Sequence, residues 1–364
     1  MKLFSLRLTI ISSLVLCILF NAEGQNIRKY SNEYLAIGVG ARAFGMSNAI
    51  AASSEGVTAG YWNPAGLVDQ KDKIQLSFMH SNLYGSVANY DYLALSTRTK
   101  NYAALAFSMI RVGVDGIPNT TDLIRNGQIN YDRVTSFSAV DYALMVSYAQ
   151  RLLNDKLSIG GTAKIIRRLG GEFAKANGFG IDAGVKYRTD SDWFFAANAR
   201  DITTTFTAWQ VQLTKAEEQT FVQTGNDIPV NSLEITLPSF ILGAAKRFTF
   251  NDEFSLLTEL NADLTTDGRR NTVLQTDMIS VAPNFGLEAN YSDIIYLRGG
   301  IGGFQEVLDL ELAQQWTFQP NIGLGLRLKN LIIDYALTDI GDNAAAQYSH
   351  VFSISTAINP SSNN

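Results

Sequence analysis

Residues 322–329 read Ile-Gly-Leu-Gly-Leu-Arg-Leu-Lys, so a large aliphatic residue alternates with a glycine or a cation. Successive side chains of a strand point to opposite faces, and this stretch therefore predicts a strand with one wholly apolar face. Strands that cross a membrane within a barrel carry apolar residues outward and small or polar residues toward the lumen. The same alternation recurs at 141–150, 179–187 and 285–291.

Short and long gaps alternate between about fourteen such stretches. The short gaps hold a few polar or turn residues and lie at 99–101, 152–156, 189–192, 249–252, 292–294 and 329–330. The longer gaps lie between them, at 113–136, 169–177, 202–237, 265–283, 304–317 and 338–348. Barrels threaded up and down through an outer membrane have short periplasmic turns and longer extracellular loops.

We therefore predict an all-β fold, a transmembrane antiparallel up-and-down β-barrel of about 14 strands over residues 73–358. The barrel closes when 350–358 pair with 73–81, and an even strand number puts both termini on the periplasmic side. Residues 359–364 form a polar tail that we expect to be disordered.

The composition agrees with a membrane barrel. Only 17% of the 364 residues are charged, against about 25% in soluble domains. After the N-terminal region, no apolar run is long enough for a transmembrane helix. The formal net charge of −5 does not favour nucleic-acid binding.

The N-terminus has the pattern of a secretory signal peptide over residues 1–24. Lys2 and Arg7 supply positive charge, 8–20 supply the apolar stretch, and Ala22-Glu23-Gly24 offers small residues for cleavage. The only cysteine, Cys17, lies inside this signal, so we expect no disulfide in the mature chain. These features predict an integral protein of the outer membrane of a Gram-negative bacterium, in contact with its lipids.

Charged residues in mid-strand fall on the face opposite the apolar one. In a soluble sandwich these residues would face solvent, whereas in a barrel they line the lumen and pair with one another or with a plug. The predicted lumen-facing charges are Asp182, Lys186, Glu259, Glu288, Arg298, Arg327 and Asp334.

Residues 25–72 differ from the strands that follow. The stretch 37–46 is rich in small residues, and Trp62 and Asn63 enter a turn in which Pro64 restricts the backbone. Such a segment fits inside a lumen, where Arg42 would meet the carboxylates. We predict a plug or hatch whose defining residues are Gly40, Ala41, Arg42, Gly45, Trp62, Asn63, Pro64 and Gly66.

Two motifs of this segment carry a family resemblance. Gly-Ala-Arg-Ala-Phe-Gly-Met at 40–46, followed by Tyr-Trp-Asn-Pro-Ala-Gly-Leu at 61–67, resembles the PorV/PorQ family of outer-membrane proteins. That family is similar to FadL-type transporters, which also carry an Asn-Pro-Ala turn in an N-terminal hatch. The resemblance implies a fourteen-stranded barrel, residues before Lys73 in the lumen, and a Bacteroidetes-like bacterium with type IX secretion.

The residues for enzyme chemistry are scarce. His80 and His350 are the only histidines, and the barrel prediction brings both to the outward face near the extracellular rim. A Ser–His hydrolytic pair with Ser81 or Ser349 is one interpretation, and polar residues at the membrane interface are the other. A metal site would lack a third ligand. We predict no catalytic residues, no metal, no cofactor and no enzyme activity.

The longest gap, 202–237, holds a predicted short helix at 214–219 and several apolar residues. One interpretation is a loop that packs on itself, and the other is a partner-docking surface, because exposed aromatic residues mark interfaces. The residues proposed for docking are Trp209, Leu213 and Phe221.

Two functions remain open at this point. In the first, which the PorV/PorQ resemblance implies, the barrel is a non-enzymatic platform of type IX secretion and holds a translocon component or a cargo signal domain. In the second, it is a FadL-like channel for hydrophobic small molecules. A conduit requires an apolar path or a lateral opening beside the hatch, whereas a platform tolerates a charge-paired lumen. The predicted charges favour the platform.

Overall fold

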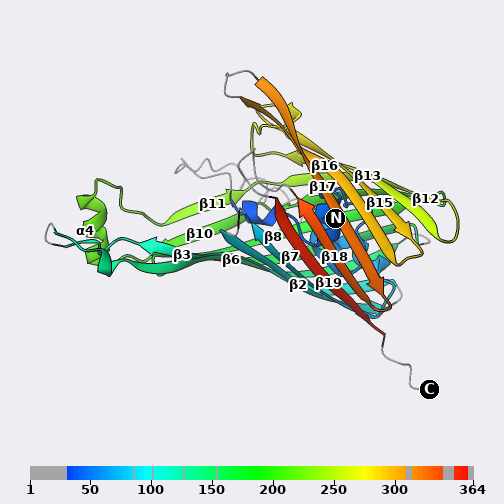
Figure 1. The fold of residues 1–364 in the computed structure, drawn as a ribbon, viewed down its shortest axis with the longest axis horizontal. Coiled ribbons are helices and arrows are strands. Elements are labelled where there is room, and N and C mark those ends of the chain that lie inside the picture. Colours follow the sequence, from blue (N-terminus) through cyan, green and yellow to red (C-terminus); the bar gives the residue numbers. More distant parts are fainter. Residues whose placement is uncertain are drawn as a thin grey trace, which may run out of the picture.

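In the computed structural model the chain forms a ring of β-strands around its own N-terminal part (Figure 1). The structure describes residues 31–359, except 84, 86, 101, 126–127, 153–154, 309–313 and 339–347. The predicted signal peptide and residues 360–364 of the predicted tail lie outside the described residues. No helix in the described part of the chain is long and apolar enough to span a membrane.

Fourteen strands pair antiparallel with their neighbours and close the ring, which confirms the predicted fold class. The closing pair is β19 with β1, with Ile358 opposite Ile74 and His350 opposite Asn82. In ring order the strands are β1 (Ile74–Leu83), β2 (Ala88–Lys100), β3 (Ala103–Asn119), β6 (Thr135–Leu152), β7 (Leu157–Gly170), β8 (Ala174–Arg188), β9 (Trp193–Arg200), β12 (Ser239–Thr249), β13 (Phe254–Thr265), β15 (Ser280–Tyr291), β16 (Ile295–Leu308), β17 (Gln314–Leu328), β18 (Leu331–Thr338) and β19 (Ser349–Ile358).

Each strand divides its side chains between an exposed apolar face and a buried inner face, as the period of two predicts. On β17, Ile322 and Leu324 are exposed, whereas Gly323 and Gly325 are buried. Large hydrophobic residues are exposed on every strand of the ring, which would be unfavourable in water and is what a lipid-facing wall requires.

The rim with short turns agrees with the sequence. The opposite rim differs from it at several places, one being that β16 and β17 extend into the gap predicted at 304–317. The gap predicted at 169–177 is a turn of only 171–173, because β7 and β8 stay hydrogen-bonded to Gly170 and Ala174. Likewise β3 and β6 continue as a paired ribbon far into the gap at 113–136. Hydrogen bonding along a ribbon does not need an apolar face. Alternation of apolar and polar residues therefore does not mark the polar ends of these strands. This ribbon also carries the hairpin of β4 (Ile124–Arg125) and β5 (Gln128–Ile129), and the short helix η4 (Tyr131–Arg133).

The wall is interrupted at one place. After β9 the chain turns through 201–204 and continues as β10 (Thr205–Val211), which pairs with the upper part of β8. Its hairpin partner β11 (Ser232–Thr236) pairs with β10, and among the described strands it has no partner on its other edge. Above Ser239 the wall therefore separates into two arms, one ending in α4 (Lys215–Gln223) and one carrying β14 (Leu274–Gln275), β16 and β17 (Figure 1).

The segment 31–72, called here the luminal segment, lies inside the ring. It contains five short helices: η1 (Glu33–Leu35), α2 (Ala41–Gly45), η2 (Gly56–Thr58), α3 (Ala59–Trp62) and η3 (Pro64–Asp69). Val39, Phe44 and Trp62 share a buried cluster with Met79 and Tyr90 of the wall. The apolar core of the molecule is thus the contact between this segment and the inner wall.

The two described ends lie at different ends of the lumen. Asp72 accepts a hydrogen bond from Asn359, just after β19, at the rim with short turns. Ser31 instead bonds Glu234 of β11 on the other side of the segment. The described chain therefore does not support the prediction of both termini on one side, because the segment runs along the lumen before it reaches β1.

Candidate functional site in the barrel lumen

Glycines of the wall hold the luminal segment at close contact. A Cβ placed on Gly160 would lie 2.5 Å from the carbonyl carbon of Pro64, and one on Gly323 would lie 3.0 Å from the Cα of Gly45. A larger residue at either position would collide with backbone, which cannot move aside as a side chain can. The inward glycines in such contact are Gly160, Gly184, Gly243, Gly286, Gly300 and Gly323.

A chain of charges joins α2 to three strands. Arg42 Nε lies 2.7 Å from Glu288 of β15, and Arg298 Nε of β16 reaches the same carboxylate at 2.7 Å. Arg298 Nη1 then lies 2.7 Å from Asp334 of β18. Two cations against two carboxylates leave no net charge, so the group can stay buried. The pKa of Arg42 is raised, since its carboxylate neighbours, Glu288 first, outweigh the effect of burial.

Two more inward charges hold the backbone of the segment. Glu259 of β13 accepts hydrogen bonds from the amides of Ala52 and Ser53, at 2.6 and 3.0 Å. Lys186 of β8 donates to the carbonyl of Ser54 at 2.8 Å and pairs with Asp69 at 2.7 Å. These contacts supply partners for backbone groups that are in no helix or strand and would otherwise be unsatisfied.

Asp69, near the end of the luminal segment, joins the segment to the wall through ion pairs. It pairs with Lys186 and also with Arg151 of β6, at 3.0 Å. Burial acts to raise the pKa of Asp69, but the two cations together lower it below its usual value. The ionised carboxylate therefore stabilises the docked end of the segment.

The Asn-Pro turn makes hydrogen bonds both within the luminal segment and to the wall. Asn63 Oδ1 caps η3 by accepting from the amide of Ala65 at 3.1 Å, and its Nδ2 donates to the carbonyl of Val185 in β8. Pro64 stands at the first position of η3, where its missing N–H costs nothing. Trp62 Nε1 donates to Val39 at 2.9 Å, which ties the two motifs together.

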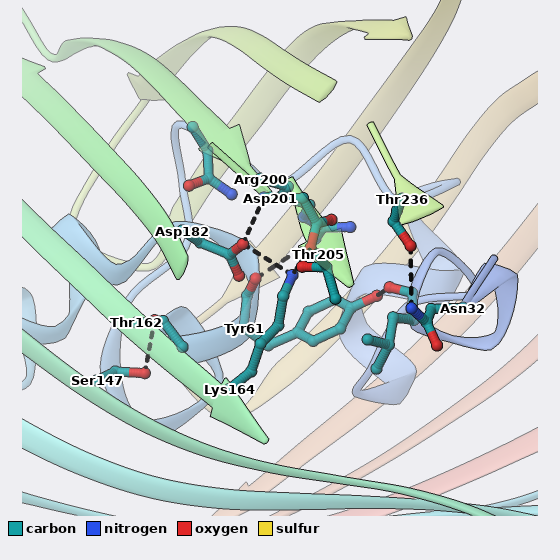
Figure 2. A network of polar contacts seen from close by, with 12 residues as sticks. Asn32, Tyr61, Ser147, Thr162, Lys164, Asp182, Arg200, Asp201, Thr205 and Thr236 are labelled. Atoms are coloured by element: carbon teal, nitrogen blue, oxygen red, sulfur yellow. Dashed lines mark hydrogen bonds and ion pairs between the residues drawn. The ribbon is translucent and has the colours of Figure 1, made fainter. Parts of the chain in front are cut away.

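A second polar group lies where the wall is interrupted (Figure 2). Lys164 of β7 lies between Asp182 of β8, at 2.8 Å, and Asp201, at 2.6 Å. The backbone of Asp201 is in the left-handed region, with φ of 53°. Its carboxylate also accepts a hydrogen bond from the hydroxyl of Thr205 at the start of β10. The buried cation and its two carboxylates thus fix the turn through which β9 leaves its line and becomes β10.

The first residues of the luminal segment lie beside this interruption. Asn32 Nδ2 donates to Thr207 of β10 at 3.0 Å and to Thr236 of β11 at 2.9 Å. Glu33, more than half exposed, pairs with Arg270 of the loop after β13 at 2.8 Å. Arg270 also pairs with Asp267 of the same loop, and these two carboxylates raise its pKa.

Two cavities flank the segment. The one beside the interruption measures about 90 Å³, and Leu35, Ala36, Tyr61 and Leu237 supply its apolar lining. The other measures about 610 Å³, lies at the rim with short turns, and is mostly polar. Arg42 and Glu288 stand at its inner end.

The seven charges predicted for the lumen all lie on inner strand positions. Asp182, Lys186, Glu259, Glu288, Arg298 and Asp334 are buried, and the luminal segment or a neighbouring strand contacts each of them. Arg327 is half-buried, lies over the ring of Tyr296 and faces the larger cavity. They form separate groups rather than one site.

The docking residues predicted in the longest gap do not form one surface. Trp209 belongs to β10, faces inward, and lies 5.1 Å from the guanidinium of Arg168. Leu213 and Phe221 are half-buried on either side of the first turn of α4, which Thr214 caps. The gap is therefore not a loose loop: it contains the β10–β11 hairpin and a capped helix. In β11, Leu233 and Ile235 do alternate with Ser232, Glu234 and Thr236, a short signal that the sequence offered.

The histidines form no Ser–His pair. His80 faces outward and its Nδ1 lies 2.7 Å from Asp91 of β2, an acidic partner that the sequence did not reveal. His350 bonds the hydroxyl of Tyr335 at 2.8 Å. Ser81 and Ser349 are buried on the opposite, inner face of their strands. Within the described residues no cluster of three or more His, Cys, Asp or Glu residues is placed to hold a metal ion.

Sequence reasoning missed Lys164 and Asp201. The alternation of 159–168 does put Lys164 on the inner face, and that signal was available. Asp201 lies in a turn outside any alternating stretch, and nothing local marks it.

No protein-family model and no curated protein matches the chain. Solved structures do. The toluene transporter TodX of Pseudomonas putida is 13% identical, with a TM-score of 0.58 over 88% of this chain and 98% of that one. The monoaromatic hydrocarbon channel CymD is 12% identical, with a TM-score of 0.56 over 89% and 98%. A Pseudomonas aeruginosa FadL homologue is 13% identical, with a TM-score of 0.51 over 87% and 97%.

The fold is FadL-like. At this level of identity the likeness concerns the fold alone, and it covers almost the whole length of these barrels. Of the two family names suggested by the sequence, the FadL-type one is therefore supported at the level of the fold, whereas PorV/PorQ stays a prediction.

Proposed function

We propose that this protein is an outer-membrane channel for hydrophobic small molecules, in which the luminal segment acts as the hatch. The single observation that carries the proposal is the interruption of the wall above Ser239, directly beside the cavity at the start of that segment. A lateral opening beside the hatch is what distinguishes a conduit from a platform. The structures most similar in fold include a toluene transporter and a monoaromatic hydrocarbon channel, which agrees with this choice.

The contacts around the cavity suit a small apolar solute. Leu35, Tyr61 and Leu237 provide apolar surface, while nearby charges such as Lys164 and Asp182 are already paired with each other. Paired charges are satisfied and do not require water, so an apolar molecule next to them leaves no unpaired ion. In this proposal the solute enters from the membrane side and leaves through the larger polar cavity into the periplasm.

The test is uptake of a radiolabelled monoaromatic hydrocarbon by cells that express the protein, compared with cells that carry an empty vector. Ala36→Trp fills the small cavity and should abolish most of the added uptake. Ala289→Trp adds the same bulk to the outward face of β15, near the rim with short turns, and serves as the matched control. Uptake no faster than the vector, or equal uptake by the two variants at equal barrel levels, would contradict the proposal.

A second candidate is the protein-holding platform of type IX secretion, which one feature favours. The arm that carries α4 exposes apolar residues beyond the barrel, among them Tyr131, Val222 and Val230. Exposed apolar groups of this kind occur at protein interfaces. Deleting 215–223 removes α4 and spares β10 and β11, so loss of a co-purifying secretion component from native membranes would favour the platform.

A further inference from the structure

We propose that Arg111 and Arg167 form a binding site for the phosphate of a lipid headgroup on the outer wall of the barrel. The site lies on the lipid-facing side and is independent of the lumen and of what passes through it. Its residues come from three consecutive strands of the ring: β3, β6 and β7.

The strand register places these residues side by side. Arg111 lies opposite Tyr142, and Tyr142 lies opposite Arg167, so one tyrosine stands between two guanidinium groups. All three occupy outward positions, because their sequence neighbours Ile110, Ala143 and Ile166 are fully buried in the lumen. Neighbouring strands lie about 4.8 Å apart, so the two arginines, which are two strands apart, start about 10 Å from each other. Two arginine side chains can close that distance on one phosphate group.

The row next to them is entirely apolar. Met109, Leu144 and Ile165 lie opposite one another on the same outer face, two residues nearer the rim with short turns. On the side away from that rim the next outward row is Gly113, Val140 and Leu169, so the level of the polar row in the membrane follows from its height above the short turns. A charge on that face destabilises the barrel by about 2–4 kcal/mol at the membrane midplane and by much less at the interface.

The height of the row agrees with the interface. Arg111 follows the first residue of β3, Ala103, by 8 positions (111 − 103), and Arg167 follows Leu157 of β7 by 10 (167 − 157). With the usual rise and tilt of barrel strands, this puts both about 20–26 Å above the short turns, and the apolar band is about 25 Å tall. Headgroups lie at this level.

The guanidinium groups keep donors available for an anion. Arg111 lies 3.3 Å from Asp91 and also hydrogen-bonds Tyr142, and its tip lies over Gly113, where a Cβ would be 2.9 Å from Nη2. Gly113 is two residues farther from the membrane centre, so the side chain extends toward the outer surface. Arg167 donates to the amide oxygen of Asn177 at 2.7 Å, a neutral partner that leaves its charge uncompensated.

The ligand class follows from this chemistry. Two guanidinium groups and a phenol offer several N–H and O–H donors to one oxyanion, and phosphate accepts paired arginine donors well. The adjoining apolar row would hold acyl chains. A phosphorylated lipid satisfies both halves of the surface at once, whereas a soluble anion satisfies only the first.

The experiment measures binding of diphosphoryl lipid A to the purified full-length barrel in detergent by native mass spectrometry. Wild type should retain the lipid, and Arg111→Gln with Arg167→Gln should bind it about tenfold more weakly or worse. Arg111→Lys with Arg167→Lys should keep most of the binding, and Lys246→Gln, an outward cation near the other rim, should keep all of it. Heat-modifiable migration checks that each variant is folded.

Three results would overturn the proposal. Equal binding of lipid A with its phosphates removed would show that acyl chains alone decide. Competition by inorganic phosphate at equal concentration would show a phosphate site with no lipid preference. A wild-type dimer that dissociates in the double glutamine variant, without any bound lipid, would assign the surface to a second copy of the chain.

Discussion

The middle and the start of the luminal segment are held in different ways. From Arg42 to Pro64 the backbone touches wall glycines and buried ion pairs. From Ser31 to Ala36 the chain is held by side-chain hydrogen bonds and one exposed ion pair beside a cavity. Close packing of backbone on backbone is costly to undo, whereas exposed pairs contribute little. We infer that residues 42–64 form a fixed core of the barrel and that residues 31–36 are the part able to move.

The largest expected effect is at the fixed part. Gly300→Val would drive a side chain into the backbone of Met46 and Ser47, 2.4 and 2.5 Å from the Cβ position. Overpacking that the surroundings can absorb destabilises by about 1–3 kcal/mol, but a clash with backbone on both sides exceeds that range and should prevent docking of the luminal segment. The adjacent Gly299 faces outward with nothing within 4 Å, so Gly299→Val is a matched control. Urea unfolding of the refolded barrel measures both. Equal stability of the two variants would mean that the segment is not closely packed.

The next effect concerns the buried charges. Arg298→Met leaves Asp334 without its cation and Glu288 with only Arg42, and breaking a buried pair destabilises by about 3–5 kcal/mol when no group compensates. Here water in the neighbouring cavity lowers the cost. Arg188→Met removes an exposed partner of Asp192 and should change stability by less than about 1 kcal/mol. Chemical unfolding in the same detergent compares them, and a similar loss for both would argue against the fixed core.

A smaller change in stability, with a change in transport, is expected at the movable start. Glu33→Gln removes the exposed pair with Arg270 and should leave unfolding unchanged within about 1 kcal/mol. If the start gates the lateral opening, hydrocarbon uptake rises. Glu218→Gln, an exposed acid on α4, is the control for surface charge. Unchanged uptake in Glu33→Gln would place the gate elsewhere.

The smallest effect is a pH dependence at Asp69. Its folded pKa is lowered, so the stability it contributes is present at neutral pH and is lost as the pH falls below the usual aspartate value of about 3.9. Wild type should therefore exceed Asp69→Asn in stability at about pH 7, and the difference should shrink at about pH 3. Unfolding curves at the two pH values measure it. A constant difference would show that the carboxylate charge is not what matters.

Much of the wall could be predicted from the chain. The period of two decides locally which residues face lipid, and so 322–328 and the inner position of Glu288 follow from sequence alone. The extended ribbons were missed because strand pairing outside the membrane carries no hydrophobic signal. The hairpin that contains Trp209 was missed because its strands are short, although Leu233 and Ile235 alternate with polar residues.

The candidate site was predictable in kind and not in detail. Arg42 was expected to meet a lumen carboxylate, but the choice of Glu288 depends on how fourteen strands are staggered around the ring. Each register adds to the previous one, so a shift in any hairpin would bring another strand to Arg42. No local pattern encodes that sum.

The sequence by itself determined the strand faces, the short turns and the small-residue composition of the luminal segment, because each depends on a few neighbouring residues. Only the tertiary structure decided where the wall opens, since that depends on Lys164 meeting Asp182 and Asp201 from different strands. It also decided which glycines touch the segment and which arginines flank Tyr142 on the outer face. Those are long-range contacts, and their geometry exists only once the ring has closed.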